Sequence, residues 1–160
     1  MGHDSNIITF GNNHVQRNQS IVIKDVLVES FEKIKGPNKR IKEIAMVPEM
    51  LIPHDPSFEN LRDVAAIMQS DLILILQTRS TTDTKFHMHK KNEAKTVATI
   101  EAIIFDIRTG VIPFTSIATN SAHIKEDKDF SDEELYTRAT IEAENRALAE
   151  IIENVGNHFN

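Results

Sequence analysis

The sequence predicts a single α/β domain in which a mixed sheet of about five strands is layered with helices. Five consecutive aliphatic residues at 72–76 have the length of a strand buried on both faces. Residues 95–107 and 111–122 alternate like strands around a short turn, which predicts an antiparallel hairpin. Helical patterns separate the earlier strands, and this alternation favours parallel crossovers. The predicted order is β-α-β-α-β-β-β-α, with residues 6–156 as the domain and 1–5 as a cloning remnant or a disordered end.

The first part of the chain supplies two short strands and one helix. Residues 6–10 are apolar and end at a Gly-Asn-Asn turn signal, so they predict the first strand. Ser20 can cap the helix that follows, and Gly36 with Pro37 ends it, because proline cannot continue the hydrogen-bond ladder. Between these limits, apolar residues recur at helical spacing: Ile23, Leu27, Phe31 and Ile34. Residues 40–47 predict the second strand.

The middle of the chain predicts a second helix and the central strand. Ser57 can cap a helix whose apolar stripe consists of Phe58, Leu61, Ala65 and Met68. Residues 71–79 follow as the strand that we place in the centre of the sheet. Residues 80–92 are polar and rich in Thr and Lys, and they predict either a loop or an extension of that strand.

The last part of the chain predicts the hairpin and the clearest helix. Asp106 can accept hydrogen bonds from turn amides, and Gly110 can adopt the positive φ that such a turn requires. Ser131 and Glu134 form a capping box at the helix start, and Gly156 predicts the helix end. Before the turn, alternate residues share one strand face: Ala98, Ile100, Ala102 and Ile104. The helix stripe has a spacing of four: Leu135, Ala139, Ala143, Ala147, Ile151 and Val155.

The composition narrows the classes of function. The net charge is -6, whereas proteins that bind nucleic acids present clustered Lys and Arg to phosphates, so we expect no nucleic-acid partner. Cysteine is absent, which excludes disulfides, thiolate metal ligands and cysteine nucleophiles. The chain has five glycines without a phosphate-binding loop or a dinucleotide fingerprint, so no cofactor is predicted. No apolar run approaches the ~18 residues of a membrane helix.

Two features suggest enzyme or metal chemistry, and each has a plainer interpretation. His87 and His89 would lie on the same side of a strand and could share a transition metal, but the adjacent lysines repel a cation. Glu101 interrupts an apolar strand face and could be a buried acid, but a lone carboxylate is weak evidence for acid–base catalysis. We therefore predict neither a metal site nor a catalytic residue. A small-molecule or metal-binding domain, or a hydrolase, with a site near these residues stays the alternative.

The segment around residues 80–92 also carries the candidate partner-binding residues. There are five such residues, and each is cationic or can become so: Lys85, His87, His89, Lys90 and Lys91. Such a cluster could receive an anionic partner, although charge clusters are more often solvated loops. A sheet-edge strand is the other candidate docking surface, because its backbone groups lack a neighbouring strand.

Three segments resemble bacterial cell-envelope lipoproteins of the rhombotarget type. They are residues 44–48 (IAMVP), 57–65 (SFENLRDVA) and 70–75 (SDLILI), followed by a Thr-containing strand and the hairpin at 104–114 (IFDIRTGVIPF). More loosely, the layout is similar to the α/β domain of the curli-secretion lipoprotein and of the Tol-system propeller protein. The likeness covers roughly residues 7–155.

This resemblance implies a lipid-anchored periplasmic domain that binds other envelope proteins and catalyses nothing, with the anchor outside this sequence. We accordingly expect a non-enzymatic protein-binding module on the periplasmic side of a bacterial membrane, with self-association left open. A cytosolic interaction domain is the remaining alternative.

Overall fold

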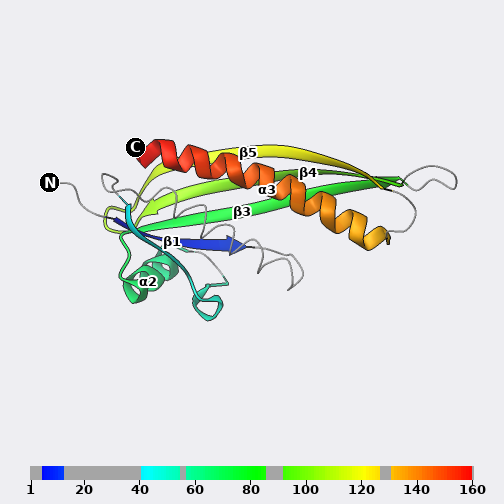
Figure 1. Cartoon of the computed structure of the whole chain (residues 1–160). Coiled ribbons are helices and arrows are strands. Elements are labelled where there is room, and N and C mark those ends of the chain that lie inside the picture. Colours follow the sequence, from blue (N-terminus) through cyan, green and yellow to red (C-terminus); the bar gives the residue numbers. More distant parts are fainter. Residues whose placement is uncertain (1–4, 13–40, 55–56, 86–91, 127–130, 160) are drawn as a thin grey trace.

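The computed structural model describes residues 5–12, 41–54, 57–85, 92–126 and 131–159 (Figure 1). Its elements in chain order are β1 (Ser5–Asn12), β2 (Ile41–Met46), the 3-10 turn η1 (Glu49–Leu51), α2 (Phe58–Met68), β3 (Leu72–Lys85), β4 (Asn92–Asp106), β5 (Val111–Glu126) and α3 (Asp132–Phe159). Neither described helix combines the length and the apolar composition that a membrane span needs.

The strands form one mixed sheet in the order β2-β1-β3-β4-β5. β1 runs parallel to both β2 and β3, whereas β3, β4 and β5 form a three-stranded antiparallel unit. The mixed α/β class is therefore confirmed, and β3 lies in the centre of the sheet as predicted. The helix expected after Ser20 lies outside the described residues, so the complete order of elements stays a prediction.

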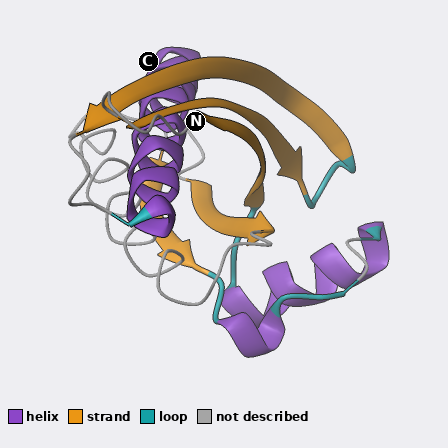
Figure 2. Ribbon diagram, turned by 90° about the vertical axis from the view of Figure 1, so that its right-hand side faces the viewer, coloured by secondary structure: helices purple, strands orange, loops and turns teal. Residues whose placement is uncertain are grey.

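The two described helices cover opposite faces of this sheet. In Figure 2 the strands curve around α3, which lies along the inner face, while α2 lies outside the curve. β3 serves both layers because successive side chains of a strand point to opposite faces. Leu72, Leu74 and Leu76 belong to the core cluster under α3, whereas Ile73 belongs to the cluster under α2. Ile73 and Leu74 are both fully buried, as expected for a strand covered on both sides.

The β4–β5 turn forms as the sequence predicts. The Oδ1 atom of Asp106 accepts hydrogen bonds from the backbone N–H groups of Arg108 at 2.9 Å and Thr109 at 3.2 Å. Gly110 donates to the Asp106 carbonyl at 2.8 Å and adopts a φ of +71°. Arg108 also lies 3.4 Å from the carboxylate of Asp71, which joins the turn to the start of β3.

Both helix starts follow the predicted capping. The Ser57 side chain accepts a hydrogen bond from the Asn60 amide at the start of α2. At the start of α3, the Ser131 Oγ atom accepts from the Glu134 amide at 3.3 Å, and the Glu134 carboxylate accepts from the Ser131 amide at 3.0 Å. The predicted stripe of α3 is buried along its whole length, and its alanines let the helix approach the sheet closely.

Three predicted boundaries are corrected by the structure. Of the two interpretations of residues 80–92, the strand extension holds as far as Lys85, because the antiparallel ladder continues to the Lys85–Glu93 pair. β5 likewise runs to Glu126 instead of ending at 122. The predicted helix end at Gly156 is wrong, since α3 continues to Phe159.

Local packing explains why α3 continues past its glycine. Gly156 is buried within the helix, and Phe159 packs against the core cluster beneath α3. The ring of His158 lies 4.8 Å from that of Phe114. These contacts stabilise a final helical turn, whereas capping rules applied to the sequence alone would end the helix at Gly156.

Candidate functional site

The structure describes one of the five residues of the predicted cationic surface. Lys85 is exposed at the end of β3, opposite Glu93 of β4. The other four, His87, His89, Lys90 and Lys91, lie outside the described residues. The anionic-partner surface and the histidine pair therefore stay predictions.

A row of ionisable side chains crosses from β4 to β5 and consists of Glu93, His123 and Lys125. Glu93 accepts from Lys125 of β5 at 2.9 Å and lies 3.2 Å from the Nε2 atom of His123. The hydrogen bond from Lys125 is the main reason that the pKa of Glu93 lies below its ordinary value, and His123 lowers it further. Glu93 thus offsets part of the positive charge at this end of the sheet. The row joins β4 to β5 and contributes little to stability at so exposed a position.

Glu101 is neither a buried acid nor a residue of an edge strand. It lies in the middle of β4, between Gln77 of β3 and Ile117 of β5, and it is partly exposed on the face opposite α3. In the described parts of the chain, no three His, Asp or Glu side chains come close enough to hold a metal ion.

Among the described strands, β5 has no neighbour along its outer edge. β5 is the last strand of the sheet, has 16 residues and pairs with β4 on one side. The Nη1 atom of Arg146 reaches around from α3 and donates to the Ser121 carbonyl at 2.9 Å, so this carbonyl points away from β4. In an antiparallel pair, both backbone groups of every second residue point to the same side. Over the regular part of the ladder, from Phe114 to Glu126, the outward set is therefore Thr115, Ile117, Thr119, Ser121, His123 and Lys125.

Pro113 lies at the register shift of the ladder, where a residue without an N–H group is tolerated. Apolar side chains accompany the edge: Ile117 is 66% exposed, and Val111 and Ile112 are 56% and 51% exposed. Exposed apolar residues along an unpaired edge are the features of a strand that can pair with another chain.

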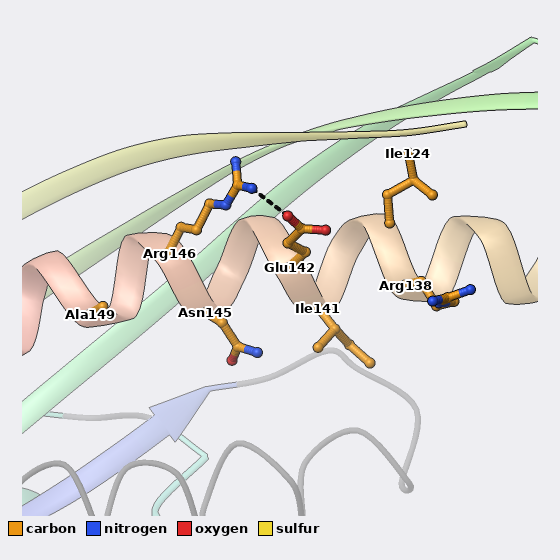
Figure 3. Close-up of a pocket in the computed structure, with 7 residues that line it drawn as sticks. All are labelled: Ile124, Arg138, Ile141, Glu142, Asn145, Arg146 and Ala149. Carbon is orange, nitrogen blue, oxygen red and sulfur yellow. Dashed lines mark hydrogen bonds and ion pairs between the residues drawn. The ribbon is translucent and has the colours of Figure 1, made fainter. Parts of the chain in front are cut away.

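Polar contacts tie α3 to the inner side of β5. The Asn120 amide donates to Glu150 at 2.8 Å, and Asn154 donates to the Ser116 hydroxyl at 3.0 Å. Arg146 also pairs with Glu142 one turn earlier. Beside this pair a shallow groove of about 480 Å³ follows the outer flank of α3 (Figure 3), lined by Ile124, Arg138, Ile141, Glu142, Asn145, Arg146 and Ala149.

A second polar cluster is buried on the other flank of α3, which faces β3. The Thr82 hydroxyl lies 2.7 Å from that of Thr96 and 3.2 Å from that of Thr140, so it connects β3, β4 and α3. One helical turn after Thr140, Glu144 is 4% exposed, and its Oε1 atom has no hydrogen-bond partner among the residues that the structure describes. We call Thr82, Thr96, Thr140 and Glu144 the buried polar seam.

Burial determines the electrostatics of Glu144. Removal from water raises the pKa of this carboxyl above its ordinary value, and a hydrogen bond from Ser80 of β3 opposes the shift in part. The site therefore favours the neutral acid. Glu144 was not among the predicted site residues, although its position four residues from both Thr140 and Leu148 places it beside the buried stripe.

The known proteins that this chain resembles are similar to it in fold. It matches no protein-family model and no curated protein. A Helicobacter pylori protein described as a homologue of a neuraminyllactose-binding hemagglutinin aligns with 99% of this chain and 83% of its own, at 10% identity and a TM-score of 0.54. The Chlamydia trachomatis protein CT253, described as hypothetical, aligns over 97% of both chains at 9% identity and a TM-score of 0.52.

Bacterial lipoproteins also occur among the similar structures. The Neisseria meningitidis lipoprotein GNA1162 aligns with 94% of this chain and 99% of its own, at 14% identity and a TM-score of 0.45. At 9–10% identity, the two structures with TM-scores above 0.5 indicate a shared fold alone, and we base nothing on a score below 0.5. The specific likeness to the rhombotarget type stays a prediction.

Proposed function

We propose that this protein is a non-enzymatic module of the bacterial cell envelope that binds an extended segment of another protein along the outer edge of β5. The binding part rests on one observation, the outward set of backbone groups from Thr115 to Lys125. The envelope part rests on the motif resemblance of residues 44–48, 57–65 and 70–75.

Length and exposed surface favour β5 over the other edge of the sheet. β2 has six residues, and a short edge offers few main-chain hydrogen bonds to a partner. β5 has 16 residues and carries the exposed Ile117 near its middle. Strand addition derives its affinity from main-chain hydrogen bonds and its specificity from alternate side chains. A partner strand would also replace Arg146 as the donor to the Ser121 carbonyl.

Site-specific photocrosslinking in the native cells tests this proposal. A photoreactive amino acid replaces Ile117 on β5, and a control chain carries it at Ile67 on α2, which is 63% exposed and far from β5 in the fold. We expect a defined adduct with an envelope protein from position 117 and none from position 67. Recovery of the adduct in the membrane fraction tests the lipid anchor.

Backbone variants then show whether the edge itself binds. Thr119→Pro removes an outward N–H group that β4 does not use, so the fold should survive while the adduct is lost. Thr119→Val is the matched control, because it keeps this N–H group and removes only the hydroxyl that lies 2.9 Å from Thr99. The proposal is wrong if Thr119→Pro folds and retains the adduct. An adduct with a second copy of the chain would assign the edge to self-association instead.

The alternatives keep their status as predictions. A small-molecule, metal or hydrolase site would lie near Glu101, His87 and His89, and a cationic docking surface would need Lys90 and Lys91. The two histidines and these two lysines lie outside the described residues. A cytosolic partner in the adduct would favour the cytosolic interaction domain.

A further inference from the structure

The two halves of α3 are attached to the sheet by different chemistry. Residues 147–159 pack Leu148, Ile151 and Val155 into the largest core cluster. Residues 132–144 instead bury one large aliphatic side chain, Leu135, and otherwise contact the sheet through small side chains, with Ala139 and Ala143 in two small clusters. A buried alanine contributes far less apolar surface than a leucine or isoleucine. The first half of α3 is therefore held more weakly by apolar packing than the second half.

This weaker half also lies over the narrower part of the sheet. β1 pairs with β3 only as far as Gln77, so in the described part of the fold β3 is an edge strand from Thr78 to Lys85. Figure 1 shows the start of α3 over this distal part of β3, β4 and β5. Ser80 and Thr82 project from this part of β3 toward α3, where the buried polar seam lies.

Nothing charged in the described surroundings compensates an ionised Glu144. The inner-face residues of β3 and β4 at this level are uncharged: Ser80, Thr82, Thr84, Ala94, Thr96 and Ala98. On α3 itself, Glu142 and Arg146 turn toward β5 and pair with each other there. Ionisation of Glu144 in place would leave a buried carboxylate with one unpaired oxygen, an arrangement that strongly favours exposure to water.

We propose that Glu144 and the buried polar seam form a pH-sensitive latch that holds residues 132–144 of α3 on the distal sheet while the carboxyl is protonated, and releases them when it ionises. Release exposes the inner face of distal β4 and β5, including Ala98 and Ala122, both now almost fully buried. The second half of α3 stays docked through the aliphatic contacts of Leu148, Ile151 and Val155. This inference does not depend on binding at the β5 edge.

The direction of the pH dependence follows from linkage. In the open form Glu144 is in water and ionises near pH 4.5, whereas the closed form holds its proton to higher pH. The open form therefore gains population as pH rises through this interval, by up to tenfold per pH unit for one proton. Above the pKa of the closed form, the population levels off.

The absence of cysteine allows this opening to be measured directly in the full chain. Ala98→Cys places a thiol beneath the first half of α3, and Ala102→Cys places one beneath the second half, at positions that are 0% and 1% exposed. The labelling rate of each cysteine between pH 4 and 8, divided by that of an unfolded peptide with the same cysteine, cancels the pH dependence of the thiol itself. We expect this ratio for Ala98→Cys to rise by up to tenfold per pH unit above pH 4.5 and then to level off, and to exceed the ratio for Ala102→Cys, which is exposed only when the whole chain unfolds.

Two variants separate the latch from general loosening. Glu144→Gln keeps the shape but cannot ionise, so the ratio should become independent of pH, while Glu153→Gln, an exposed position on the same helix, should leave the rise intact. A flat ratio in the native background, or the same rise with Glu144→Gln, would overturn the latch. Hydrogen exchange of the unsubstituted chain gives a second measurement: equal loss of protection in both halves of α3 would also overturn it.

Discussion

Gly110 is the residue on which the geometry of the β4–β5 turn depends most directly. Its φ of +71° lies in the left-handed region, which L side chains adopt only at a cost. A Cβ atom at this position would lie 3.7 Å from the Cζ atom of Phe58, an ordinary van der Waals distance. Any cost of a substitution therefore comes from the backbone and not from a clash.

We expect Gly110→Ala to lower the free energy of unfolding by about 1 kcal/mol, because alanine must adopt the same positive φ. Gly110→Asn should cost less, since asparagine tolerates this conformation better than alanine. Urea denaturation of the three proteins measures both differences. Equal stabilities of the alanine and asparagine variants would mean that the turn relaxes to a negative φ.

Individual residues also show where sequence-based prediction stops. The turn at Asp106 and Gly110 could be predicted because each residue acts through its own backbone and near neighbours. The role of Glu144 could not, because its burial depends on how closely α3 approaches β3 and on which way the helix is rotated. The pattern of the helix gives the centre of its buried stripe, while tertiary packing determines the width of that stripe.

At the scale of elements, the start of α3 depends on its capping box. Ser131 satisfies the amide of Glu134, and Glu134 in turn satisfies the amide and hydroxyl of Ser131. These hydrogen bonds hold the pKa of the Glu134 carboxyl below its ordinary value, and the bond from the Ser131 amide has the largest effect. A depressed pKa means that the ionised form supports the folded state, so this contribution is present above about pH 4.5 and is lost as pH falls.

Ser131→Ala removes the cap and should lower the free energy of unfolding by about 1 kcal/mol at pH 7. The difference between the two proteins should shrink toward acidic pH, where Glu134 is protonated in both. Thr137→Ala is the control on the same helix, and it should not destabilise, because alanine has the higher helix propensity. Thermal unfolding followed by circular dichroism between pH 3 and 7 checks both expectations. A difference that is independent of pH would show that the Ser131 hydroxyl does not stabilise the ionised Glu134 carboxylate, because alanine keeps the backbone N–H that also binds it.

Element boundaries were harder to predict than element types, for a physical reason. Residues 80–85 carry the polar and threonine-rich composition of a loop, yet they are strand because β4 supplies a partner for each of them. Gly156 likewise ends a helix only when nothing favours its continuation, and here Phe159 and His158 find packing partners beyond it. Propensity describes the isolated segment, whereas pairing and packing depend on the rest of the chain.

At the scale of the whole molecule, β3 joins two layers into one structure. Leu74 lies in the core under α3, and its neighbour Ile73 lies in the core under α2. The single domain expected over residues 6–156 requires that these layers unfold together. A sheet that shares its central strand between two cores should transmit the loss of either core to the other.

Matched isoleucine-to-valine changes test this cooperativity. Ile73→Val removes one methylene from the α2 layer and Ile151→Val removes one from the α3 layer, at positions that are both fully buried. Each change should lower the free energy of unfolding by about 0.5–1.5 kcal/mol, and the double variant should show the sum of the two losses. In urea, one transition with an unchanged slope is expected for all four proteins. Two separate transitions, with Ile73→Val shifting one and Ile151→Val the other, would mean that the layers unfold independently, because β3 alone would then be too weak a connection between them.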